Sequence, residues 1–282
     1  MAKRQFGIST HLYHNYRLNR DHLVEIAAFG FDRVELFATR THFDYHNPAA
    51  VADLQQWLAA AGLDLHSVHA PIGESFAGGR WGPPLTLASS DAATRAKALT
   101  EAELALQIAR RLPFKVFVAH IGLPRSQHPT ATDNSRDGAR RSIDELVKLA
   151  EPLGVQIAIE VIPNELSRAG SLVHFIENVL EDSGIGICLD FGHAHMDGDL
   201  VEAIEIVSEH LVTTHVHDNR GRTDDHLVPF DGTIDWPGAL TAIQKVGYDG
   251  TFLLEIAAHG SAKDTLRKAK KARGRMEKLL AV

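Results

Sequence analysis

The sequence is poor in cysteine: among its 282 residues the single thiol is Cys188, inside the apolar run IGICLD. One cysteine excludes a disulfide framework and is typical of a reducing compartment. No run of the sequence reaches the roughly 18 to 20 apolar residues of a membrane span. The first residues, MAKRQFGIST, lack the apolar centre of a signal peptide. We therefore expect a cytoplasmic protein that has no membrane partner.

Positively charged residues are outnumbered, with 29 Lys and Arg against 36 Asp and Glu. The formal net charge is −7, and no block rich in lysine and arginine occurs before LRKAKKARGR at residues 266–275. Proteins that bind nucleic acid usually carry a basic face, so we expect no nucleic-acid partner. No GxGxxG motif follows the first apolar run, which argues against an open dinucleotide-binding sheet.

Short apolar runs alternate with amphipathic stretches of helix length along the whole chain. The runs are QFGIST, DRVELFA, DLHSVHA, FKVFVAHIG, VQIAIEVI, IGICLDFG, LVTTHVHD and TFLLEIA. Helices are expected over 21–30, 48–62, 91–112, 137–154, 171–184, 200–211, 236–247 and 264–282, several of them ending on glycine. Strands that are apolar throughout indicate a parallel sheet buried on both faces. Eight such units predict an α/β fold, a single (β/α)8 TIM barrel formed by one domain over residues 1–282.

Carboxylate and imidazole side chains gather where the predicted strands end. In a barrel of this kind all these ends meet at the face that carries the active site. Burying several carboxylates together is costly without a compensating positive charge. Imidazole and carboxylate groups together suit Zn, Mn, Fe or Co. We therefore predict a divalent-metal site built from strand-end residues, with these candidates: His69, His120, Glu160, Asp190, His193, His215, Asp224, His226 and Glu255.

Some polar residues at the same strand ends have two readings. Each of these residues either lines the pocket or serves the structure only: His11, Glu35, His195, His217 and His259. The segment PIGESFAGGRWGPPLTLAS, which follows the third strand, is long for a connection. It is either a lid over a bound substrate or a loop anchored by Trp81.

The chain resembles the xylose isomerase-like TIM barrels, a superfamily of sugar and sugar-phosphate isomerases and epimerases that also holds endonuclease IV. The motifs that carry the resemblance are SVHAP, IEVIPN, CLDFGHAH, HVHDN followed by DDHLVPFDGTIDW, and LLEI. They are spread over essentially the whole chain.

The epimerase branch of this superfamily implies one divalent ion held by Glu160, Asp190, His215 and Glu255. There the two glutamates, Glu160 and Glu255, act as catalytic acid and base, with their order left open. His193 is expected to contact substrate oxygens. Further substrate-binding residues are expected to be Arg220 or Arg222, Trp81 and His11.

The endonuclease IV branch implies three zinc ions and nine ligands, and each ligand has a counterpart here. The five added to the four above are His69, His120, His193, Asp224 and His226. Strand 4 departs from that branch, because AHIGLP stands where those enzymes carry a histidine–proline–glycine turn.

Two functions follow. The preferred one is a metal-dependent isomerase or epimerase of carbohydrate metabolism, which removes a proton next to the carbonyl of a small sugar or sugar phosphate. The alternative is a multinuclear zinc phosphodiesterase or abasic-site endonuclease. The number of ions, between one and three, and the presence of a homo-oligomer stay open.

Overall fold

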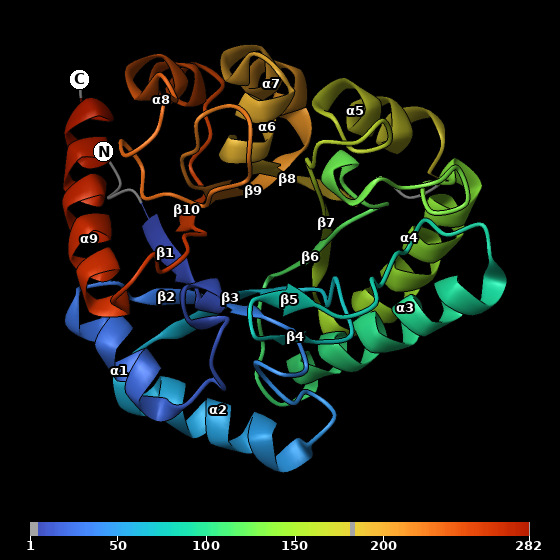
Figure 1. The fold of residues 1–282 in the computed structure, drawn as a ribbon, viewed down its shortest axis with the longest axis horizontal. Coiled ribbons are helices and arrows are strands. Elements are labelled where there is room, and N and C mark those ends of the chain that lie inside the picture. The colour runs from blue at the N-terminus through green and yellow to red at the C-terminus, as the bar shows by residue number, and fades with distance from the viewer. Residues whose placement is uncertain (1–4, 181–183, 282) are drawn as a thin grey trace.

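Eight parallel strands close into a barrel in the computed structural model, which describes residues 5–180 and 184–281. Around the barrel the strands follow the order β1-β10-β9-β8-β7-β6-β3-β2, and Figure 1 looks along its axis. The predicted α/β barrel is confirmed. The strands are β1 (Gln5–Ser9), β2 (Arg33–Phe37), β3 (Asp64–His69), β6 (Val116–Ala119), β7 (Gln156–Glu160), β8 (Gly186–Asp190), β9 (Leu211–Val216) and β10 (Thr251–Leu254).

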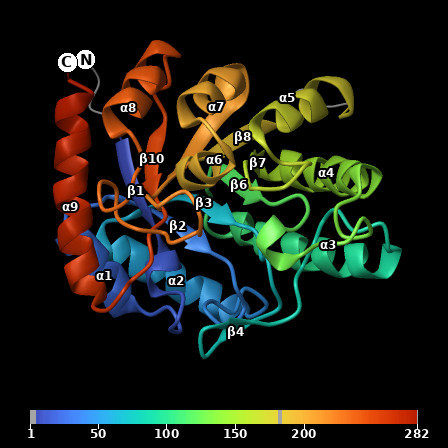
Figure 2. The ribbon, with the colours of Figure 1, turned by 45° about the horizontal axis from the view of Figure 1, so that its top comes forward.

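Helices form a ring outside the strands, as both ribbon views show (Figures 1 and 2). Most begin at an Asn, Asp or Ser whose side chain accepts a hydrogen bond from the first helical turn. None of the helices in the described part of the chain combines the length and apolar character that a membrane span requires. They are α1 (Arg20–Ala28), α2 (Pro48–Ala61), α3 (Ala92–Leu106), α4 (Arg136–Ala150), α5 (Ala169–Asn178), α6 (Phe191–Asp197), α7 (Leu200–Val207), α8 (Trp236–Lys245) and α9 (Ala262–Leu279).

Three details differ from the sequence expectations. Helix α6 was not predicted, because FGHAHMD is short and directly continues strand β8. The connection after β3 contains a small hairpin of β4 (Phe76–Ala77) and β5 (Arg80–Trp81), which the sequence did not predict. The helix expected over 171–184 ends at Asn178, and residues 181–183 of that prediction, like 282 of the last helix, lie outside the described residues.

The inward-facing side chains of the strands form layers: one layer fills the barrel interior, and the next layer forms the site. Val118, Ala158 and Cys188 form a small buried cluster with Val116. Side chains two residues apart in a strand share a face. Glu160 and Asp190 therefore lie on the same inward side as Ala158 and Cys188, one layer nearer the carboxyl end of the barrel.

Asp218 organises the long connection between β9 and α8. Its backbone pairs with Leu227 through two hydrogen bonds of 2.8 Å. Its buried carboxylate accepts hydrogen bonds from the Phe230 N–H at 3.0 Å, the Ile234 N–H at 3.2 Å and the Trp236 indole N–H at 2.8 Å. The connection is thereby folded back over the end of the barrel.

Replacing Asp218 should therefore destabilise the protein strongly. The Asp218→Ala change leaves several buried N–H donors without an acceptor, which we expect to cost roughly 2–4 kcal/mol of unfolding free energy. Chemical denaturation measures it. The matched control is Asp231→Ala, which removes only the surface ion pair with Lys268 and should change the unfolding free energy by less than about 0.5 kcal/mol. Equal effects of the two changes would contradict this account.

Candidate metal centre and substrate cavity

Four buried side chains converge at the carboxyl end of the barrel. One ligand atom from each of Glu160, Asp190, His215 and Glu255 lies within 4.8 Å of all the others. Strand register explains the meeting, because Asp190 pairs with His215 across β8 and β9. The Glu255 N–H, just after β10, donates to the Val216 carbonyl at 3.2 Å.

The geometry around His215 suits a cation. Its Nδ1 atom lies 3.3 Å from Glu160 Oε2 and 3.4 Å from Glu255 Oε2. Bonds of about 2.0–2.2 Å in a tetrahedral site place neighbouring ligand atoms roughly 3.4 Å apart. Within the described residues, His215 Nδ1 and Glu160 Oε1 are buried without a hydrogen-bond partner. A divalent ion would satisfy such atoms and offset three carboxylates, so the residues fit the implied metal.

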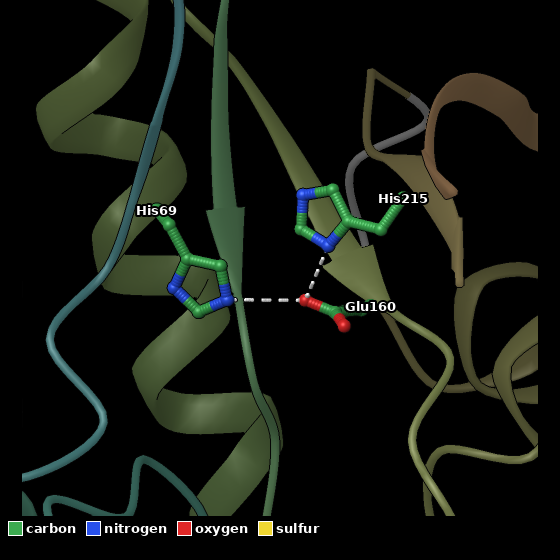
Figure 3. A group of neighbouring side chains, drawn as sticks. All are labelled: His69, Glu160 and His215. Carbon is green, nitrogen blue, oxygen red and sulfur yellow. Dashed lines mark hydrogen bonds and ion pairs between the residues drawn. The ribbon is translucent and has the colours of Figure 1, made fainter. Parts of the chain in front are cut away.

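Two more histidines close the cluster on its other side. Glu160 Oε2 lies 3.2 Å from His69 Nε2 and 3.0 Å from His120 Nε2, and Figure 3 shows His69 and His215 meeting at this oxygen. Burial alone would raise the pKa of Glu160, but the charges of His215 and His120 outweigh it and hold that pKa well below its usual range. Glu160 is therefore ionised, as a metal ligand must be.

A second cluster lies beside the first. Asp224 Oδ2 lies 3.1 Å from both His193 Nε2 and His226 Nε2. Helix α6 places His193, because the Asp190 side chain caps the helix by accepting from the His193 N–H at 2.6 Å. His226 has a positive φ of 45°, an uncommon conformation that is held in place by its Nδ1 atom, 2.8 Å from the Glu255 carbonyl.

His217 joins the two clusters. It belongs to two groups with ligand geometry, one with Asp190 and His193 and one with Asp224 and His226. The sequence left its role open. Its signal was the spacing of two residues from His215, which gives both side chains the same strand face.

Glu35 lies behind the first cluster, on the side away from the cavity. It is fully buried, and its Oε2 atom lies 3.1 Å from His215 Nε2 and accepts from the Ser67 hydroxyl at 2.8 Å. An ionised carboxylate accepts only, so Nε2 carries a hydrogen, and Nδ1 is the atom that would ligate a divalent ion in the cluster. Carboxylates orient metal-binding histidines in this way.

A cavity of about 390 Å³ opens above the clusters, a volume ordinary for small-molecule sites. Glu160 and Glu255 line it, whereas Asp190 and His215 lie below its floor and are absent from the lining. The other predicted ligands in the lining are His69, His120, His193, Asp224 and His226.

The remaining predicted substrate residues divide into two groups. His11 and Trp81 line the cavity, and the His11 ring lies 4.5 Å from that of His226. Burial, helped by the charges of His226 and His14, lowers the pKa of His11 well below its usual value. Arg220 and Arg222 are exposed and lie outside the cavity lining, so their contact with substrate stays a prediction.

The hairpin that carries Trp81 is tied to the barrel. The Thr41 hydroxyl bonds both the N–H and the carbonyl of Phe76 at 2.9 Å. The Trp81 ring lies 4.9 Å from that of His14 and 5.0 Å from that of Phe76. Of the two readings of this connection, these contacts favour the anchored loop.

The sequence of the chain matches the model of a known family. The model of the xylose isomerase-like TIM barrel matches residues 23–279. The chain belongs to the xylose isomerase-like TIM barrel family.

Within this family, similarity extends over most of the chain. An uncharacterized protein of Methanocaldococcus jannaschii is 26% identical over 258 residues, 89% of this chain and 83% of its own. An L-ribulose-5-phosphate 3-epimerase of Salmonella paratyphi A is 26% identical over 176 residues, 60% of each chain. A crystal structure of a D-tagatose 3-epimerase-like protein superposes with a TM-score of 0.78 at 25% identity, covering 98% of this chain and 97% of the other.

The contact between Glu35 and His215 generates a test on metal affinity. Glu35→Ala should weaken divalent-metal binding about 10- to 100-fold, because His215 loses the acceptor that fixes its hydrogen and ring orientation. Calorimetric titration of the metal-free protein with Zn²⁺ or Mn²⁺ measures it. Glu35→Gln keeps an acceptor oxygen and should lose less. Unchanged affinity in a folded Glu35→Ala protein would refute this positioning role.

Proposed function

We propose that the protein is a divalent-metal-dependent isomerase or epimerase that acts on a small sugar or sugar derivative. The observation that carries the proposal is the division among the four central residues. Glu160 and Glu255 reach the cavity, while Asp190 and His215 are buried beneath it. Two carboxylates that face a substrate and converge on one buried point suit proton removal and return. The names of the epimerase relatives support the same class.

Each residue has a defined part in the proposed reaction. A bound divalent ion supplies Lewis acidity and a template for substrate oxygens. One of Glu160 and Glu255 takes the proton from the carbon next to the carbonyl, whose electron pair forms an enediolate. The other glutamate, protonated at that stage, gives its proton to the opposite face of the carbon and inverts it, so the two glutamates exchange protonation states. Asp190 and His215 hold the ion, and His193 orients a substrate hydroxyl.

We also propose a single domain, a cytoplasmic location and no nucleic-acid partner. The negative net charge supports the last of these. The geometry favours no particular oligomer.

Exchange of substrate hydrogen with solvent tests the proposed chemistry. Metal-loaded protein in D₂O should incorporate deuterium next to the carbonyl of a free ketose from a panel that includes D-tagatose. Mass spectrometry and proton NMR detect the incorporation. Glu160→Gln and Glu255→Gln should each reduce its rate at least about a hundredfold.

A matched control is Glu101→Gln. The Glu101 carboxylate forms hydrogen bonds with Tyr45 and His46 and lies outside the cavity lining. This change should therefore leave the rate of deuterium exchange unchanged. A metal-loaded protein that exchanges no ketose hydrogen would contradict the proposal.

The second cluster favours a second candidate, a multinuclear zinc phosphodiesterase. His217, Asp224 and His226 form a further group with ligand geometry, and His193 Nε2 lies 3.1 Å from Asp224 Oδ2. Elemental analysis of metal per chain separates the two candidates. We expect about one ion, retained in Asp224→Ala, because the central cluster does not use Asp224. Two or three zinc ions, some of them lost in that variant, together with cleavage of abasic-site DNA, would favour the phosphodiesterase.

A further inference from the structure

The cavity differs chemically between its two ends. The inner end carries the carboxylates and histidines of the two clusters. The rest of the lining is largely apolar and includes Ile72, Phe76, Trp81, Leu85, Leu123 and Pro124, beside the polar Ser126 and Gln127. Large exposed hydrophobic side chains are few in the described chain, and Trp81, 40% exposed, lines this wall. An open apolar surface inside a cavity marks a ligand contact.

The two ends belong to one continuous surface. The Trp81 ring lies 6.4 Å from that of Phe37, and Phe37 lies 4.7 Å from the ring of His69. His69 in turn contacts Glu160. These contacts form a continuous row of rings from Trp81 to the histidine that contacts Glu160.

Among the described residues that line the cavity there is no lysine or arginine. The charged carboxylates of the lining are Glu160, Asp224 and Glu255. A divalent ion would carry two positive charges against three carboxylates in the central cluster alone. A phosphate group in this cavity would lose its hydration and meet these carboxylates without a lysine or arginine to pair with, because the lining histidines His193 and His226 are already paired with Asp224, and this is unfavourable.

Two arginines that are adjacent in sequence to lining residues are directed elsewhere. Arg125, next to Pro124, pairs with Asp197 at 2.7 Å and Glu165 at 3.4 Å. Arg80 precedes Trp81 in strand β5, and successive side chains of a strand point to opposite faces.

We propose that the substrate is an uncharged sugar or polyol derivative with an apolar group at the end remote from its carbonyl, and that phosphorylated sugars are excluded. The sugar oxygens bind at the clusters, and the apolar group packs on the wall formed by Ile72, Phe76, Trp81 and Leu85. This inference rests on the proposed function and specifies its substrate class.

Binding of three matched probes tests the substrate class. The probes are D-fructose, D-fructose 6-phosphate and 6-O-benzyl-D-fructose, titrated into metal-loaded protein in a calorimeter. We expect the benzyl ether to bind at least about tenfold more tightly than the free sugar. The phosphate should bind at least about tenfold more weakly than the free sugar. Equal or tighter binding of the phosphate, or no binding of any probe, overturns the proposal.

Two pairs of variants locate the effect. Gln127 is exposed at the mouth of the cavity, so Gln127→Lys adds a cation without disturbing the core. It should strengthen phosphate binding severalfold, whereas the uncharged control Gln127→Met should not. Trp81→Ala should remove most of the advantage of the benzyl ether, and Trp81→Phe should retain part of it. Unchanged phosphate affinity in Gln127→Lys together with an undiminished advantage of the benzyl ether in Trp81→Ala contradicts the proposed wall.

Deuterium exchange separates this proposal from the function on which it rests. Failure of all three probes to exchange, with the expected binding order, would refute the epimerase chemistry and support the substrate class. Exchange that is fastest with the phosphate would support the chemistry and refute the substrate class.

Discussion

Charge compensation at one buried point governs the structure of the site. Glu160, Asp190 and Glu255 lie at the ends of three strands on the Nδ1 side of His215, and all four side chains are buried. Three carboxylates in such surroundings are tolerated only beside positive charge. The surrounding histidines partly supply it, and the geometry suits a divalent ion. The barrel makes the arrangement achievable, because parallel strands end at one face.

The neighbouring elements hold this point in place. Glu35 fixes the far nitrogen of His215 from below. Asp190 caps α6 and so sets the position of His193. Asp218 folds the connection that brings Asp224 and His226 over the barrel. Each of these carboxylates contributes both to the stability of the fold and to the position of the site residues. We therefore expect changes in unfolding free energy and in metal affinity to occur together.

Much of this was predictable, for physical reasons that also explain the failures. Buried parallel strands leave apolar runs that can be read directly, so the barrel was predicted. The ligand-type residues at strand ends could be recognised because burying charged side chains together costs free energy unless a compensating charge is present. The role of Glu35 depends on a partner 180 residues away, which no local pattern reveals. Helix α6 is too short to show helical periodicity. The absence of lysine and arginine from the cavity lining depends on which side chains face inward, and the sequence does not show this.

Diffraction from crystals grown with Mn²⁺ or Zn²⁺ and measured at the absorption edge of the metal tests the central claim most directly. The account predicts an anomalous peak at about 2.0–2.2 Å from ligand atoms of Glu160, Asp190, His215 and Glu255. A metal-binding protein whose peak lies elsewhere, with these four side chains hydrogen-bonded to one another around water, would contradict it.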